Sequence, residues 1–218
     1  MKSDSIKVLV STITALSGVG GSYWKMEDNW NDAKGSLHLT AGAGATFVIG
    51  NPGDTFGARS VGYGPVFFSK FRSKLFSTIQ FPVPRSFRIP EKISSKEYEE
   101  QCIAKIEKRL EKDNSIAAFV MESGAQMAGG VIIYPKNFQK RIAKLCKKND
   151  VLLVLDEIAT GFGRLGSMIE YESQNSIPDI VSFGKMITGG YQTFAATLTT
   201  KKISDSFLGE FSQMKHLF

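Results

Sequence analysis

The sequence predicts an α/β fold in which helices cover both faces of a mostly parallel sheet. Two observations support this prediction. Short runs that are apolar throughout alternate with amphipathic helical segments in the central part of the chain, which is typical of parallel strands buried on both faces. The 218 residues are 42% hydrophobic and 22% charged, so the chain has enough apolar material for one large domain and is not disordered.

The first element with a clear pattern is a helix expected from about residue 94 to residue 114. The segment from Ser94 to Glu97 resembles a capping box, in which both side chains satisfy backbone N–H groups. Apolar side chains then recur at helical spacing: Tyr98, Cys102, Ile106 and Leu110. We therefore expect an amphipathic helix with one face against the sheet.

A strand, a helix and a second strand are expected next. Residues 116–121 and 151–155 are the apolar runs of the two strands. Pro135 falls at the expected first turn of the helix between them, and its apolar positions are Phe138, Ile142, Leu145 and Cys146. Later segments predict a short helix and two further strands: 168–174, 180–183 and 193–200.

The N-terminal part has no sustained period. Glycines interrupt residues 1–50, where we expect only weak strands at 37–39 and 46–49. The first 21 residues weakly resemble a secretory signal, but hydroxyl side chains break the apolar run and no cleavage site follows. Residues 62–88 are rich in Phe and Pro, which predicts an ordered surface excursion around the sheet.

Charge and cysteine content argue against several functional classes. The net charge of +6 arises from basic stretches that acidic and apolar residues interrupt, which indicates solvated helix faces rather than a nucleic-acid site. Cys102 and Cys146 are far apart, so neither a zinc site nor a disulfide scaffold is indicated. No run reaches the ~18 apolar residues of a membrane span. We expect a soluble cytoplasmic protein without a metal, and without nucleic acid or a membrane as partner.

Polar residues follow two of the predicted strands, where open α/β sheets place their ligand sites. Asp156 and Glu157 come directly after the run 151–155, and Lys185 follows Gly184 at the end of the run 180–183. Lys185 lies 29 positions after Asp156, a separation that allows one strand–helix–strand crossover. Both side chains can therefore reach one pocket.

This pair suggests a specific chemistry, although simpler interpretations remain open. A lysine with small neighbours at a strand end is a candidate Schiff-base nucleophile, because burial lowers its pKa. A nearby aspartate can keep a pyridinium nitrogen protonated, which makes pyridoxal phosphate an electron sink. From the residues alone, a lone lysine such as Lys185 is more often a surface residue, and an Asp–Glu pair such as Asp156 and Glu157 after a strand is often a helix cap or a metal ligand.

Two stretches resemble class III pyridoxal-phosphate-dependent aminotransferases. Residues 155–164 read LDEIATGFGR and residues 183–191 read FGKMITGGY. The resemblance implies the large cofactor-binding domain of fold type I, pyridoxal 5'-phosphate as cofactor and a homodimer. It further implies that residues 1–50 are a degenerate N-terminal part of this domain and that residues 51–218 bind the cofactor.

The resemblance also implies roles for individual residues. Lys185 would bind the cofactor covalently and move a proton between substrate and cofactor, and Asp156 would pair with the pyridine nitrogen. Ile158 would pack against the cofactor ring, and three polar residues would help to build the pocket: Glu122, Gln126 and Asp54. Judged without the family, Ile158 is equally well a core residue and Glu122 a helix or loop cap.

Softer similarity at residues 53–62 and 195–200 points to those members of the class that act in biotin synthesis. This implies transfer of an amino group from S-adenosylmethionine to 8-amino-7-oxononanoate, which gives 7,8-diaminononanoate. Two alternatives stay open. One is a class III enzyme for ω-amino acids or diamines, and the other is a non-catalytic remnant or a subunit of a split enzyme.

Some positions depart from the family pattern. Asn51 stands at the position of an aromatic residue that contacts substrate, and Ser123 stands where a proline follows Glu122. The glycine–serine turn that binds the cofactor phosphate has no clear counterpart. The pattern also predicts a small C-terminal domain after Phe218. We therefore expect a truncated chain, or one whose partner chain supplies the missing parts.

Overall fold

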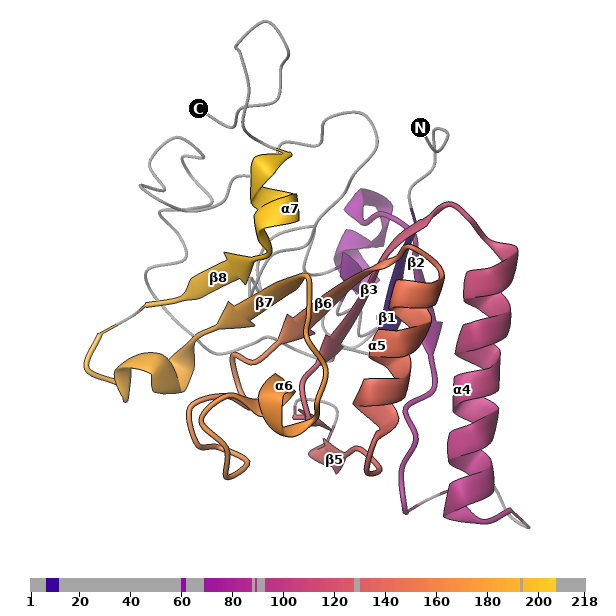
Figure 1. Ribbon diagram of the computed structural model, residues 1–218, viewed down its shortest axis with the longest axis horizontal. Coiled ribbons are helices and arrows are strands. Elements are labelled where there is room, and N and C mark those ends of the chain that lie inside the picture. Colours follow the sequence, from indigo (N-terminus) through magenta and orange to yellow (C-terminus); the bar gives the residue numbers. More distant parts are fainter. Residues whose placement is uncertain are drawn as a thin grey trace, which may run out of the picture.

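The computed structural model describes residues 7–11, 60–61, 69–87, 89, 93–127, 130–192 and 194–206. Within these ranges a six-stranded sheet has the order β2-β1-β3-β6-β7-β8 (Figure 1). Its strands are β1 (Lys7–Ser11), β2 (Thr78–Phe81), β3 (Ile116–Glu122), β6 (Leu152–Asp156), β7 (Ile180–Phe183) and β8 (Ala196–Thr199). Neighbouring strands are parallel except for β8, which runs antiparallel to β7. The predicted α/β fold with a mostly parallel sheet is confirmed.

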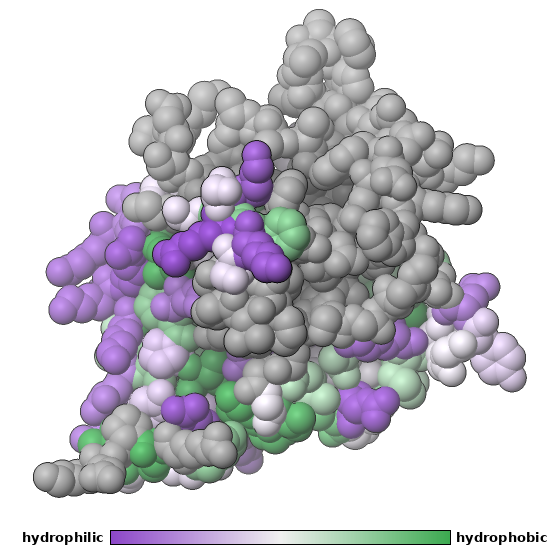
Figure 2. Space-filling model, turned by 180° about the vertical axis from the view of Figure 1, so that it is seen from behind, coloured by the Kyte–Doolittle hydropathy of each residue, from purple (hydrophilic) through white to green (hydrophobic). Residues whose placement is uncertain are grey.

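Two amphipathic helices, α4 (Ser95–Lys112) and α5 (Phe138–Lys148), lie side by side over one face of this sheet (Figure 1). Their apolar stripes are buried, whereas α4 presents hydrophilic side chains along one edge of the molecule (Figure 2). Ion pairs join their outer rims, with Arg141 at 2.7 Å from Glu100 and Lys148 at 2.8 Å from Glu111. Exposed ion pairs of this kind contribute little to stability because water and salt screen them, so the apolar stripes hold the helices in place.

Side chains of the central strands alternate between two apolar layers. One layer, beneath α4 and α5, includes Phe119, Met121, Leu153 and Leu155. The opposite layer includes Ala118, Val120 and Val154, together with Val61 and Phe76. Because side chains alternate along a strand, the last residues of β3 and β6, Glu122 and Asp156, lie on the side away from the two helices. The alternation thus selects which polar residues share a face at the sheet's carboxyl edge.

The structure adds one strand that the sequence did not predict and corrects one expectation in the N-terminal part of the chain. The N-terminal run compared with a secretory signal contains β1, which pairs with both β2 and β3. The segment 62–88 is not a surface excursion throughout, because it contains the 3₁₀ helix η1 (Ser69–Lys74) and the sheet strand β2. Neither β1 nor β2 follows a segment with helical spacing, which is the pattern that indicated the equally short strands β6 and β7. The weak strands expected at 37–39 and 46–49 lie outside the described residues.

The start of α5 was also predicted wrongly. Pro135 precedes the helix, which begins at Phe138. Asn137 between them has a left-handed backbone, with φ of 69°, and the Phe138 N–H donates to the Pro135 carbonyl oxygen at 3.0 Å. The proline therefore belongs to a turn that leads into the helix, and asparagine is among the few residues that tolerate this conformation.

The capping box of α4 generates a stability prediction. Ser94 Oγ accepts a hydrogen bond from the Glu97 N–H at 3.2 Å, so Ser94→Ala should lower the free energy of unfolding by about 1 kcal/mol. Urea unfolding followed by circular dichroism measures this loss. The neighbouring exposed residue offers a matched control, because Ser95→Ala should change stability by less than about 0.5 kcal/mol. Equal losses in both variants would contradict the assignment.

Candidate active site

Three polar residues form a row across the carboxyl ends of β3, β6 and β7. The strand register places Glu122 opposite Asp156 and Asp156 opposite Ser182. All three are buried, with at most 5% of each residue exposed. Burying polar side chains is costly unless they find partners, so this row marks the chemically unusual edge of the sheet.

Asp156 is the residue in this row whose pKa lies well above its ordinary value. Its Oδ1 accepts a hydrogen bond of 2.8 Å from the Ile158 N–H. Burial raises the pKa of the Asp156 carboxyl to about 6, while the Ile158 amide and the charge of Lys185 act to lower it and the charge of Glu157 acts to raise it. An ionised carboxylate at this position is therefore stabilised by a cationic partner.

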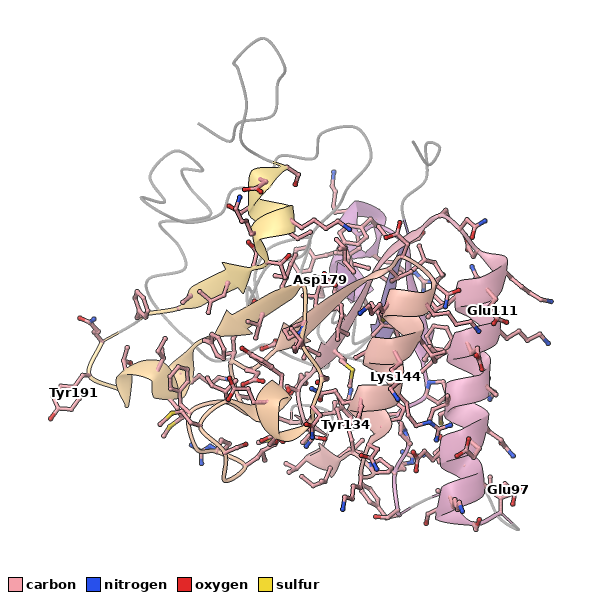
Figure 3. The ribbon with its side chains drawn as sticks, viewed as in Figure 1. Glu97, Glu111, Tyr134, Lys144, Asp179 and Tyr191 are labelled. Carbon is pink, nitrogen blue, oxygen red and sulfur yellow. The ribbon has the colours of Figure 1, made fainter. Side chains whose placement is uncertain are left out.

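Lys185 follows the next strand of the sheet, and its charge lowers the pKa of the same carboxyl. It follows Gly184 at the end of β7 and opens the 3₁₀ helix η2 (Lys185–Thr188). Its backbone φ is 47°, a left-handed conformation that costs a non-glycine residue about 1–2 kcal/mol. The fold therefore holds Lys185 in a strained turn, within electrostatic reach of Asp156. Farther along, Tyr191 points away from the described parts (Figure 3).

Ile158 connects the two turns that follow β6 and β7. A Cβ atom added at Gly184 would lie 3.1 Å from Cγ2 of Ile158, closer than most contacts of a real Cβ atom. The missing side chain at position 184 thus allows Ile158 to pack beneath the Lys185 turn. Ile158 is almost fully buried. Its packing against a cofactor ring stays a prediction.

Glu157 has a different role from its neighbour Asp156. Its two carboxylate oxygens accept hydrogen bonds from the N–H groups of Glu170, at 2.9 Å, and Tyr171, at 2.5 Å. These residues begin the short helix α6 (Glu170–Ser173). Burial raises the pKa of the Glu157 carboxyl, and hydrogen bonds from both amides and from the Ser123 side chain act to lower it. The helix-cap interpretation therefore applies to Glu157 and not to Asp156.

Glu122 holds the turn that follows β3. Its Oε2 accepts a hydrogen bond of 2.8 Å from the Met127 N–H. The turn contains β4 (Ala125–Gln126), which pairs with β5 (Ile132–Ile133), and Gln126 is buried. The contact to Met127 matches the loop-cap interpretation of Glu122. Contacts of Glu122 and Gln126 with a cofactor stay predictions.

The remaining site predictions concern residues that the structure does not describe, or a metal ion. Asn51 and Asp54 lie outside the described residues, and their expected roles stay predictions. Across the described ranges, no three His, Cys, Asp or Glu side chains are grouped in a way that could bind a metal ion. No helix within those ranges is both long and apolar enough to cross a bilayer.

A buried amide next to this edge was not predicted from the sequence. Gln139 of α5 is fully buried. Its Oε1 accepts a hydrogen bond from the Gly124 N–H at 2.7 Å, and its Nε2 donates to Ser123 Oγ at 2.9 Å and to Ser176 Oγ at 2.8 Å. The signal in the sequence was a polar residue directly after Phe138 at the apolar start of the helix, where burial requires partners.

Comparison with known proteins decides the family. The sequence pattern of class-III aminotransferases matches residues 25–213. The chain belongs to this family. A curated relative, the adenosylmethionine-8-amino-7-oxononanoate aminotransferase of Aquifex aeolicus, is 42% identical over 173 residues, which are 76% of this chain and 37% of that protein. The chain thus spans about two fifths of the length of the curated relatives it matches.

Solved structures of class III aminotransferases share the fold. The adenosylmethionine-8-amino-7-oxononanoate aminotransferase of Methanocaldococcus jannaschii aligns with a TM-score of 0.68 and 30% identity, covering 99% of this chain and 39% of that one. An amine transaminase from an uncultivated Pseudomonas species, solved in its PLP-bound form, aligns with a TM-score of 0.66 and 31% identity, covering 73% and 37%. The described sheet and helices therefore belong to the aminotransferase fold.

The burial of Asp156 predicts a pH-dependent gain in stability on neutralising it. The pKa is about 6 in the folded chain against an ordinary value of 3.8, so above pH 6 the folded state bears the cost of a buried charge. Asp156→Asn should therefore raise the free energy of unfolding of the ligand-free chain by about 3 kcal/mol near pH 7.5. The gain should shrink to under about 1 kcal/mol near pH 4, because folded Asp156 is then protonated.

Urea unfolding at the two pH values measures this difference. Asp150→Asn is the matched control, because it makes the same chemical change at an exposed position just after α5. The gain for Asp156→Asn should depend on pH more strongly than the effect of this control. A gain for Asp156→Asn that does not change with pH would show that this carboxyl does not ionise in a buried site.

Proposed function

We propose that the chain is the cofactor-binding part of a pyridoxal-phosphate-dependent aminotransferase. The observation that carries the proposal is the buried carboxylate of Asp156 within electrostatic reach of Lys185, in a chain that belongs to the class III family. Pyridoxal phosphate supplies an electron sink for the carbanion formed at the substrate carbon. The residues fit this group, because a buried carboxylate with a raised pKa is stabilised by a protonated ring nitrogen.

Asp156 and Lys185 have different roles in the proposed reaction. The Asp156 carboxylate, whose Oδ1 is oriented by the Ile158 N–H, would pair with the ring nitrogen and keep it protonated. Lys185 Nζ would hold the cofactor at its carbonyl carbon and would move a proton at the substrate carbon as a general acid/base. Ile158 closes the turn beneath Lys185 and keeps water from this side of the pair.

The proposed substrates are S-adenosylmethionine as amino donor and 8-amino-7-oxononanoate as acceptor. The product would be 7,8-diaminononanoate, on the route to biotin. The proposal is supported by the names of relatives that are 39% and 42% identical to this chain. A second candidate is an amine or ω-amino acid transaminase, because a solved amine transaminase is also 31% identical.

We propose that the protein acts in the cytoplasm as a homodimer. Apolar side chains at the β8 edge of the described sheet support association with a second copy. Tyr191 is 98% exposed, and Phe194 and Leu198 are about half exposed. Exposed apolar patches of this kind mark association surfaces.

Covalent trapping of the cofactor tests the role of Lys185. After incubation with pyridoxal phosphate and reduction by borohydride, peptide mapping should place the label on Lys185. The label should be lost in Lys185→Ala and kept in Lys144→Ala, since Lys144 is an exposed lysine of α5. A label spread over surface lysines, and unchanged in Lys185→Ala, would contradict the proposal.

Product analysis tests the substrates. The protein, alone and with any partner chain, is mixed with S-adenosylmethionine and 8-amino-7-oxononanoate, and 7,8-diaminononanoate is measured by mass spectrometry. We expect product that depends on both substrates and on Lys185. Transfer from a diamine or an ω-amino acid, with none from S-adenosylmethionine, would favour the second candidate. Absence of every transfer would favour a non-catalytic chain.

A further inference from the structure

The inference concerns Gln139, whose amide orientation is determined by its partners. The Gly124 N–H can only donate, so the oxygen of the Gln139 amide must face it, at 2.7 Å. The amide nitrogen therefore faces the hydroxyls of Ser123 and Ser176, at 2.9 and 2.8 Å. Gln139 thereby joins α5 to the turn after β3 and to the segment between α6 and β7.

Ser123 connects Gln139 to the end of β6. The Ser123 Oγ accepts the hydrogen bond from Gln139 Nε2, and the Ser123 N–H donates to the Asp156 carbonyl oxygen at 2.9 Å. The Ser123 side chain also acts to lower the pKa of the Glu157 carboxyl. Ser123 thus links Gln139 directly to the backbone of Asp156.

The turn that receives these bonds has little freedom to move. Gly124 has φ of +73°, and a Cβ atom there would lie 2.6 Å from Oε1 of Glu170. On the far side of β6, the Glu157 N–H donates to the Ser182 carbonyl oxygen at 2.8 Å. Backbone hydrogen bonds with Ser123, which follows β3, and with Ser182 of β7 therefore fix the residues at the end of β6.

We propose that Gln139 is a positioning residue for Asp156: through Ser123 it sets where the end of β6, and with it the Asp156 carboxylate, lies between β3 and Lys185. The proposal deepens the function proposed above and rests on it for the role of Asp156. Gln139 itself need not touch cofactor or substrate. Its loss should displace Asp156 without removing any group that takes part in the chemistry.

The titration of Asp156 in the full chain without cofactor tests the proposal. Carbon-13 NMR of labelled aspartate follows the carboxyl, and Asp156→Asn identifies its signal. The charges of Lys185 and Glu157 act on this carboxyl, so a displacement changes its midpoint. Gln139→Met, which keeps the length and removes the amide, should shift the midpoint by about half a pH unit or more.

Two further variants make the result decisive. Ser123→Ala removes only one hydroxyl, so it should fold and should produce a shift in the same range. Ile142→Val, one turn along α5 in the apolar layer, destabilises the same helix and should leave the midpoint unchanged. Midpoints equal to that of the unaltered chain in both Gln139→Met and Ser123→Ala, or an equal shift in Ile142→Val, would overturn the proposal.

Cofactor binding separates this proposal from the function on which it rests. If the unaltered chain binds pyridoxal phosphate, Gln139→Met should weaken binding on the order of tenfold, whereas Ile142→Val should not, because misplacing a binding group is costly. If the unaltered chain does not bind pyridoxal phosphate, the proposed function fails. The titration of Asp156 still decides whether Gln139 positions it.

Discussion

The burial of carboxylates at the carboxyl edge of the sheet is the constraint on which the rest of this structure depends. Four acidic residues are nearly inaccessible there: Glu122, Asp156, Glu157 and Glu170. An ionised carboxylate removed from water must be paired or hydrogen-bonded. Backbone N–H groups supply much of this compensation, because turns and helix ends leave them without partners. The turns after β3 and β6 and the start of α6 are built around these contacts.

The hydrogen bonds that compensate for burial differ between Glu157 and Asp156. Glu157 accepts two backbone hydrogen bonds, and the Ser123 side chain acts to lower its pKa, so its charge serves the fold. Asp156 accepts a single backbone hydrogen bond and is buried at a cost in stability. Such a cost, together with the left-handed backbone of Lys185, is typical of sites where function has overridden local stability.

Ser123 shows how a departure from the family pattern is accommodated. The resemblance predicts a proline at this position, and a proline has no N–H to donate. Serine there supplies both an N–H for the Asp156 carbonyl and a hydroxyl that accepts a hydrogen bond from Gln139. The change therefore adds a hydrogen bond between the ends of β3 and β6. It makes the position of Asp156 dependent on a residue of α5.

The sequence by itself determined the central elements and the two residues proposed for catalysis. The helix at 94–114 and the strands at 116–121, 151–155 and 180–183 were predicted within a few residues, because long periodic or wholly apolar segments carry their own signal. Asp156 and Lys185 were recognisable because they follow such strands beside glycines. Strands β1 and β2 were not predicted, although β6 and β7 are equally short, because neither follows a segment with helical spacing. Both are identified only by their pairing.

Only the tertiary structure decided how adjacent polar residues divide their roles. Asp156 and Glu157 are both acidic and follow the same strand, and nothing in their types says that one caps α6 while the other lies near Lys185. The alternation of side chains along β6 and the register with β3 and β7 make that choice. Gln139 was not predicted for the same reason. Its hydrogen-bond partners lie 15 to 37 positions away in the sequence, and they contact it only when α5 packs on the sheet.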